Sequence, residues 1–95
     1  MLKKFILYPN YPNPFNPSTI IRCYIKESAF TEITIYNILG QPVKKLFSGK
    51  LHAGEHAWRW NGHNDFGQPV ASGVYYYQFK INHRIVSNRK MLLIR

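Results

Sequence analysis

Apolar and polar residues alternate along this chain in short runs. In residues 20–26 the apolar side chains of Ile21, Cys23 and Ile25 take every second position, and polar side chains fill the positions between them. Successive side chains of a strand point to opposite faces of its sheet. This period of two therefore predicts a half-buried strand.

The same pattern predicts about seven strands. They cover residues 5–8, 20–26, 31–38, 43–47, 55–60, 74–81 and 84–95. Turns are expected over residues 27–30, 39–42, 49–54 and 61–69, and Asn82-His83 fits a two-residue hairpin turn. Neither helical periodicity nor an internal repeat is apparent. We predict an all-β fold, an antiparallel β-sandwich or a small barrel.

A proline-rich stretch precedes the long strands. Pro12, Pro14 and Pro17 alternate with asparagines around Phe15. Each proline fixes its own φ and pushes the preceding residue toward extended geometry. We expect a stiff, extended connector with Phe15 as its aromatic anchor. The predicted organisation is a short strand or leader over residues 1–8, the connector over residues 9–19 and one β domain over residues 20–95.

Length and charge limit the possible functions. A chain of 95 residues suggests one domain with a modest core, and its aromatic content of 16% favours strands. Thirteen Lys and Arg against four Asp and Glu give a net charge of +9. This excess indicates either an acidic partner, such as nucleic acid, anionic lipid or an acidic protein surface, or a solubilised sheet with protected edges.

The single cysteine excludes a disulfide within the chain, and alternation predicts that Cys23 is buried. No apolar run approaches the roughly 18–20 residues that a membrane-spanning helix needs. Residues 1–8 weakly resemble the start of a signal peptide, but Pro9 ends the apolar part without a cleavage site. If this domain is exported, its export signal for the inner membrane is expected on sequence outside this chain.

The reactive side chains form no catalytic or metal-binding pattern. His52 and His56 would lie roughly 13 Å apart on a strand, which is too far to share one ion. Residues 61–67 have the composition of a calcium loop but offer one carboxylate, Asp65, so turn-stabilising hydrogen bonds are the favoured role. The acids are not paired, and no serine lies in a nucleophile elbow. We predict no enzyme activity, no metal and no cofactor.

Two aromatic clusters are candidate binding surfaces. Tyr75-Tyr76-Tyr77 offers rings for stacking on single-stranded nucleic acid, and Trp58 and Trp60 offer rings for stacking on sugar. Alternation turns all of them inward except Tyr76, so core packing accounts for them. We expect no nucleic-acid partner.

Short motifs follow one another along the chain. They are YPNPFNPST at residues 11–19, IYNILGQPV at 35–43, AGEH at 53–56, WNG at 60–62, FGQPVASGVY at 66–75 and RKMLLIR at 89–95. In this order the chain resembles the type A C-terminal sorting domain of type IX secretion cargo from Bacteroidota and related bacteria. Asn61 stands where that family usually has Asp, but both residues serve the same tight turn.

The resemblance implies an immunoglobulin-like sandwich of seven strands and a non-catalytic sorting function. The cargo that precedes such a domain crosses the inner membrane by a separate N-terminal signal. The folded domain is then recognised in the periplasm by the outer-membrane translocation machinery. A sortase-like cysteine peptidase usually removes the domain and links the cargo to anionic lipopolysaccharide. The implied final location is the cell surface or the medium.

The resemblance also assigns roles to residues. The strand that the machinery reads comprises Arg89, Lys90, Met91, Leu92, Leu93, Ile94 and Arg95. The leader motif comprises Pro12, Asn13, Pro14, Phe15, Asn16 and Pro17, and the turn glycines are Gly40, Gly54, Gly62, Gly67 and Gly73. A final edge strand with free backbone groups can add a strand from an acidic partner, or pair with a second copy of itself.

Two further interpretations remain open. Similar sandwiches with Trp-Asp-Gly and Gly-Val-Tyr motifs occur in the flagellar hook-capping family and in adhesins, where they mediate contacts and are not cleaved. A carbohydrate-binding module is the third interpretation. The proline leader and the basic ending favour the sorting domain.

Overall fold

The computed structural model describes residues 4–95, so the first three residues of the expected leader over residues 1–8 lie outside the described residues. The strands are β1 Phe5–Leu7, β2 Thr19–Ile25, β3 Ala29–Asn37, β4 Pro42–Leu51, β5 Gly54–Trp60, β6 Gly73–Ile81 and β7 Arg84–Leu93. Within this part of the chain, no helix is long and apolar enough to cross a bilayer.

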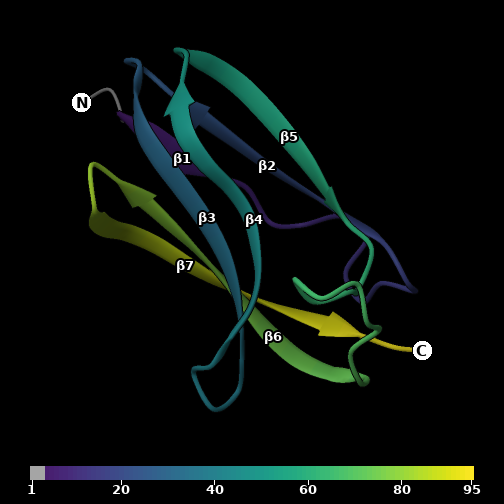
Figure 1. Ribbon diagram of the computed structural model, residues 1–95. Coiled ribbons are helices and arrows are strands. Elements are labelled where there is room, and N and C mark those ends of the chain that lie inside the picture. The colour runs from purple at the N-terminus through teal and green to yellow at the C-terminus, as the bar shows by residue number, and fades with distance from the viewer. Residues whose placement is uncertain (1–3) are drawn as a thin grey trace.

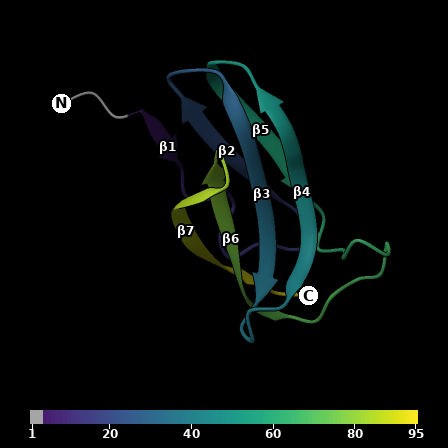
Figure 2. The same cartoon turned by 60° about the vertical axis from the view of Figure 1, so that its left-hand side comes forward.

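The strands form two antiparallel sheets that pack face to face (Figure 1). Sheet A has the order β1-β2-β5, and sheet B has the order β4-β3-β6-β7. In the turned view, β3 and β4 of sheet B lie in front of β2 and β5 of sheet A (Figure 2). This arrangement confirms the predicted all-β antiparallel sandwich.

Alternation along the strands builds one core between the sheets. Ile21 and Cys23 of β2 and Ile33 and Ile35 of β3 are all fully buried. Each buried aliphatic side chain contributes about 1.5–3 kcal/mol through removal from water. Burial also raises the pKa of the Cys23 thiol to about 11, so this cysteine is an inert part of the core.

Several strand bounds differ from the prediction. β4 continues to Leu51, so the expected loop over residues 49–54 shrinks to residues 52–53, and Gly49 pairs with Thr31 inside the ladder. A glycine weakens a strand by only about 0.5–1 kcal/mol, which a ten-residue ladder outweighs. β3 begins at Ala29 within the expected turn, and β7 ends at Leu93, two residues before the predicted end.

The predicted hairpin turn at Asn82-His83 is confirmed. It joins β6 to β7, and its two residues have φ values of 51° and 67°. Two successive positive φ values define the type I′ turn, whose twist matches that of a two-strand ribbon. The hairpin, together with a register shift between Phe79 and Lys80, sets the alignment in which β7 lies on β6.

Two loops share both sequence and conformation, so the expectation of no internal repeat is wrong. Residues 37–43 read Asn-Ile-Leu-Gly-Gln-Pro-Val, and residues 64–70 read Asn-Asp-Phe-Gly-Gln-Pro-Val. In each, the Asn side-chain oxygen accepts the backbone N–H groups two and four residues later, at 2.9–3.0 Å. Gly40 and Gly67 take φ values of 77° and 76°, which glycine adopts without a steric penalty.

Removing either asparagine acceptor should destabilise its loop. We expect Asn37→Ala and Asn64→Ala each to lower the free energy of unfolding by about 1–2 kcal/mol, because two backbone N–H groups lose their partner. Urea denaturation measures the loss. Asn→Asp at either position keeps the oxygen and should cost clearly less; an equal loss for Ala and Asp would contradict the role of the side-chain oxygen.

Candidate functional site

The proline connector is not a straight spacer, because it folds back on the sandwich. Tyr11 and Ile20 exchange both backbone hydrogen bonds, at 3.1 and 2.9 Å. Inside this loop the Asn10 amide donates to the Thr19 hydroxyl at 3.0 Å, and that hydroxyl donates to the Pro12 carbonyl at 2.9 Å. The prediction of an extended connector missed this bend, because proline rules describe single residues and not the side-chain contacts that close a loop.

Tyr8, the residue just before the connector, is tied to the core of sheet B. The buried Tyr77 hydroxyl donates a hydrogen bond to the Tyr8 carbonyl at 2.8 Å. Burial raises the pKa of Tyr77, so the hydroxyl keeps its proton and remains a donor at neutral pH. The contact links residues that are 69 positions apart in the sequence.

Phe15 anchors the middle of the connector between the sheets. Its side chain is 1% exposed, and its ring centroid lies 5.6 Å from that of Trp60. Trp60 in turn meets Tyr75 edge-on at 5.4 Å and donates its indole N–H to the His63 carbonyl. The motif therefore completes an aromatic cluster at one end of the core.

The connector also occupies the outer edge of the last part of β7. The Phe15 N–H donates to the Leu92 carbonyl at 3.0 Å, and the Ile94 N–H donates to the Phe15 carbonyl at 2.9 Å. The Asn13 side-chain oxygen accepts the Leu92 N–H at 3.0 Å. The prediction of a free final edge is wrong at these residues, because the connector supplies partners for their backbone groups.

The predicted sorting strand is split between the core and the surface. Met91 and Leu93 are 1% and 0% exposed and point between the sheets, whereas Lys90, Leu92 and Ile94 are exposed. The Arg89 guanidinium donates from Nε to the Leu7 carbonyl at 2.7 Å, which ties β7 to β1 across the open side of the sandwich. A partner therefore meets only part of the seven-residue segment.

Arg95 fastens the loop between β5 and β6. Its guanidinium donates to the carbonyls of Val70 and Gly62, and its backbone N–H donates to the Ser72 hydroxyl at 2.9 Å. Gly62 has a φ of 76°, and a Cβ there would lie 2.8 Å from Arg95 Nη2. The sequence carries no spacing signal for this contact, because the residues meet only after the sheets pack.

The other turn glycines have different settings. Gly40 and Gly67 lie in the two matched loops, whereas Gly54 and Gly73 are the first residues of β5 and β6.

The side chains of His56, His63 and Asp65 have structural partners. His56 Nε2 lies 2.7 Å from the His52 carbonyl oxygen, and His63 Nδ1 lies 3.1 Å from the Asn61 carbonyl oxygen. Both Asp65 carboxylate oxygens accept the Lys45 N–H at 3.2 Å, which covers part of the β4 edge. Over residues 4–95 no group of three or more His, Cys, Asp or Glu side chains is placed to hold a metal ion.

Positive charge gathers on sheet B. Its four strands carry seven lysines and arginines and one glutamate, whereas the strands of sheet A carry two arginines and one glutamate. On β7 the basic residues are Arg84, Arg89 and Lys90. This asymmetry makes sheet B the side on which an acidic partner is attracted.

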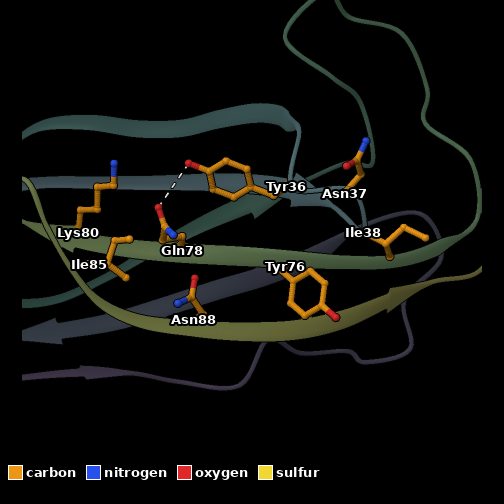
Figure 3. Close-up of a pocket in the computed structure, with 9 residues that line it drawn as sticks. Tyr36, Asn37, Ile38, Tyr76, Gln78, Lys80, Ile85 and Asn88 are labelled. Atoms are coloured by element: carbon orange, nitrogen blue, oxygen red, sulfur yellow. Dashed lines mark hydrogen bonds between the residues drawn. The ribbon is translucent and has the colours of Figure 1, made fainter.

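The outward face of sheet B holds a shallow groove across β3, β6 and β7 (Figure 3). Tyr36 and Tyr76 are cross-strand partners there, and the Tyr36 hydroxyl donates to Gln78 Oε1 at 3.3 Å. Ile85 and Asn88 line the groove on the β7 side. Sequence reasoning found Tyr76 but missed Tyr36, because the register of β3 on β6 was unknown.

Residues 18–84 match the family profile of the FlgD Ig-like domain, which is more than half of the chain. The chain therefore belongs to the FlgD Ig-like domain family, and the predicted immunoglobulin-like fold is confirmed. The search of curated proteins found no match to this chain.

Solved structures share this fold. PorU from Porphyromonas gingivalis matches with a TM-score of 0.79 and 17% identity, over 98% of this chain and 10% of PorU. PorZ from P. gingivalis matches with a TM-score of 0.61 and 24% identity, over 94% of this chain and 11% of PorZ. FlgD from Pseudomonas aeruginosa matches with a TM-score of 0.58 and 19% identity, over 79% of this chain and 59% of that protein. The chain thus spans about a tenth of the length of PorU and PorZ.

Removing the aromatic anchor should destabilise the whole domain. We expect Phe15→Ala to lower the free energy of unfolding in urea by about 3–5 kcal/mol, because it leaves a cavity beside Trp60. Amide exchange at Leu92 and Ile94 should also accelerate. Phe66→Ala is the control, because that ring is 87% exposed and its loss should change stability by about 0.5 kcal/mol or less. Equal effects of the two variants would show that Phe15 is not an anchor.

Removing the Arg95 side chain should loosen one loop and leave the strands in place. We expect Arg95→Ala to cost about 1–2 kcal/mol and to speed hydrogen exchange at the Val70 amide, which bonds to the Gly62 carbonyl. Arg84→Ala, at the exposed start of β7, is the control for lost charge. Unchanged exchange at Val70 in Arg95→Ala would refute the fastening role.

Proposed function

We propose that this chain is a non-catalytic sorting module that directs a fused cargo protein through the outer membrane by type IX secretion. The observation that carries the proposal is the joining of the connector motif to β7. The two segments that bear the sorting-domain resemblance lie far apart in the sequence, yet Asn13 and Phe15 make three hydrogen bonds to Leu92 and Ile94. These hydrogen bonds hold the two segments side by side.

The comparisons support this proposal through the parts of the chain that each one covers. The FlgD Ig-like profile spans residues 18–84 and leaves out the connector motif and most of β7. The likeness to PorU extends over 98% of the chain, so the shared fold includes both segments. PorZ, whose likeness covers 94% of the chain, is an essential bacterial surface component of the type-IX secretion system of P. gingivalis.

The arrangement suits a module that is read while folded. The chain enters at β1, and its C-terminal end lies at the opposite end of the sandwich (Figures 1 and 2). A cargo joined ahead of β1 would leave the connector and the end of β7 accessible to the translocation machinery. Removal of the module by a sortase-like peptidase would then separate the cargo from the recognised end.

A reporter assay tests the proposal. A fluorescent protein with an inner-membrane signal and residues 1–95 at its C-terminus is expressed in a host with type IX secretion and in a machinery-deficient mutant. We expect reporter at the surface or in the medium only in the competent host. Reporter held in the periplasm of both hosts, with the module folded, would refute the proposal.

Point variants are better suited to this assay than deletion of the last five residues. Deletion of residues 91–95 removes Met91 and Leu93 from the core, so lost export would report unfolding. Lys90→Glu reverses the charge at an exposed position of β7, and Lys50→Glu does so on the distant edge strand β4. We expect reduced export for Lys90→Glu and normal export for Lys50→Glu.

A second candidate function is an uncleaved interaction module. The profile match across β2–β6 favours it, because that frame is shared with FlgD-type domains. A domain that stays attached to its cargo in the periplasm of both hosts would support this alternative.

A further inference from the structure

The edge of β7 has an occupied part and an open part. The backbone groups of Leu92 and Ile94 point outward and bond to the connector. Because backbone groups along a strand alternate in direction with a period of two, those of Lys90 and Asn88 point to the same side. Within residues 4–95 these outward N–H and C=O groups make no backbone hydrogen bond beyond the sheet.

Other sheet edges are less suited to an acidic strand. Asp65 places its N–H and carboxylate against Val43 and Lys45, so part of the β4 edge is covered by a negative group. β1 has only three residues, and Arg89 bonds to its Leu7 carbonyl. β5 carries one glutamate and one arginine, which gives no preference for either charge. The β4 strand is as basic as β7, but its edge carries the Asp65 carboxylate, which would repel an acidic strand. The β7 edge combines open backbone groups at Asn88 and Lys90 with a basic strand that has no such carboxylate against it.

Charge on β7 selects the chemistry of the occupant. The strand carries Arg84, Arg89 and Lys90 and no acid. A second copy pairing through the same edge would bring like charges together, which destabilises cross-strand pairs. An extended segment with acidic side chains would instead be attracted and held in register.

The groove beside this edge adds a side-chain contribution. An added strand would lie about 4.8 Å from β7, so its outward side chains would stand beside Asn88 and Lys90. Asn88 and Ile85 line the groove in Figure 3, and Tyr76 is the cross-strand partner of Lys90. Long side chains of the added strand would therefore reach over Asn88 toward Gln78 and Tyr76.

We propose that the open edge of β7 at Asn88 and Lys90 binds an acidic extended peptide as a fifth strand of sheet B, with the connector left in place. The inference deepens the proposed function and rests on it for its biological role, because a sorting module must present a surface to its machinery. The proposed docking edge lies at Asn88 and Lys90, ahead of Leu92 and Ile94, whose outward backbone groups already bond to the connector.

Titration with a designed peptide tests the proposal on the whole chain. The probe is a capped ten-residue peptide of alternating Glu and Thr, and the control peptide alternates Lys and Thr. We expect the acidic probe to shift the backbone amide signals of Asn88 and Lys90 in NMR spectra, with weaker binding at higher salt. Equal shifts with the basic peptide, or shifts confined to other strands, would overturn the proposal.

Proline variants separate backbone pairing from charge attraction. Lys90→Pro removes an outward N–H that the β6 ladder does not use, so an edge strand tolerates it. We expect Lys90→Pro to abolish binding, whereas Lys90→Ala should bind several-fold more weakly than the unaltered chain. Asn88→Pro is the second variant, and an unshifted Leu92 amide shows that β7 and the connector are intact in each. Undiminished binding by both folded proline variants would refute strand addition.

The peptide and reporter experiments test the docking edge and the sorting function independently. Peptide binding without reporter export would overturn the proposed function and leave the docking edge standing. Export that is unaffected by folded Lys90→Pro would overturn the docking edge and leave the sorting function standing.

Discussion

The docking of the connector through Phe15 is the contact on which the rest of the structure depends. The ring fills the space beside Trp60, and the backbone on either side of it then lies along the end of β7. Burial of one such side chain contributes about 1.5–3 kcal/mol, which is a large share of the 5–15 kcal/mol that typically stabilises a domain. The same contact closes part of a sheet edge and holds residues 13–15 of the connector against the last residues of β7.

The two edge strands of sheet B are partly covered by segments from other parts of the chain. Asp65 covers part of β4, the connector covers the end of β7, and a lysine stands on the stretch that stays open. Exposed edges invite aggregation, and lysine is a common defence against it. The feature that would attract an acidic strand therefore also discourages pairing between copies. Asp65 lies inside the region matched by the FlgD Ig-like profile, whereas the connector motif at residues 12–17 and Lys90 lie outside it.

Which side chains become neighbours across a sheet depends on the register between strands, and the sequence alone did not give that register. Tyr36 faces Tyr76 only because β3 lies on β6 in one particular alignment. The matched loops at Asn37 and Asn64 have similar sequences but different places in the fold, because one joins β3 to β4 and the other lies within the long connection between β5 and β6. Local rules on proline and glycine also predicted the stiffness of the connector without its fold-back, since that bend depends on Asn10 and Thr19 meeting across the loop.

The sequence by itself determined the class of fold, most strand positions, the hairpin at Asn82-His83 and the inward faces, because these follow from a period of two and from local turn chemistry. It also identified Phe15 as an anchor. Only the tertiary structure decided that Arg95 serves the loop at Gly62, that the connector covers Leu92, and that the open edge lies at Lys90. Those facts depend on contacts between residues tens of positions apart, which exist only once the two sheets have packed.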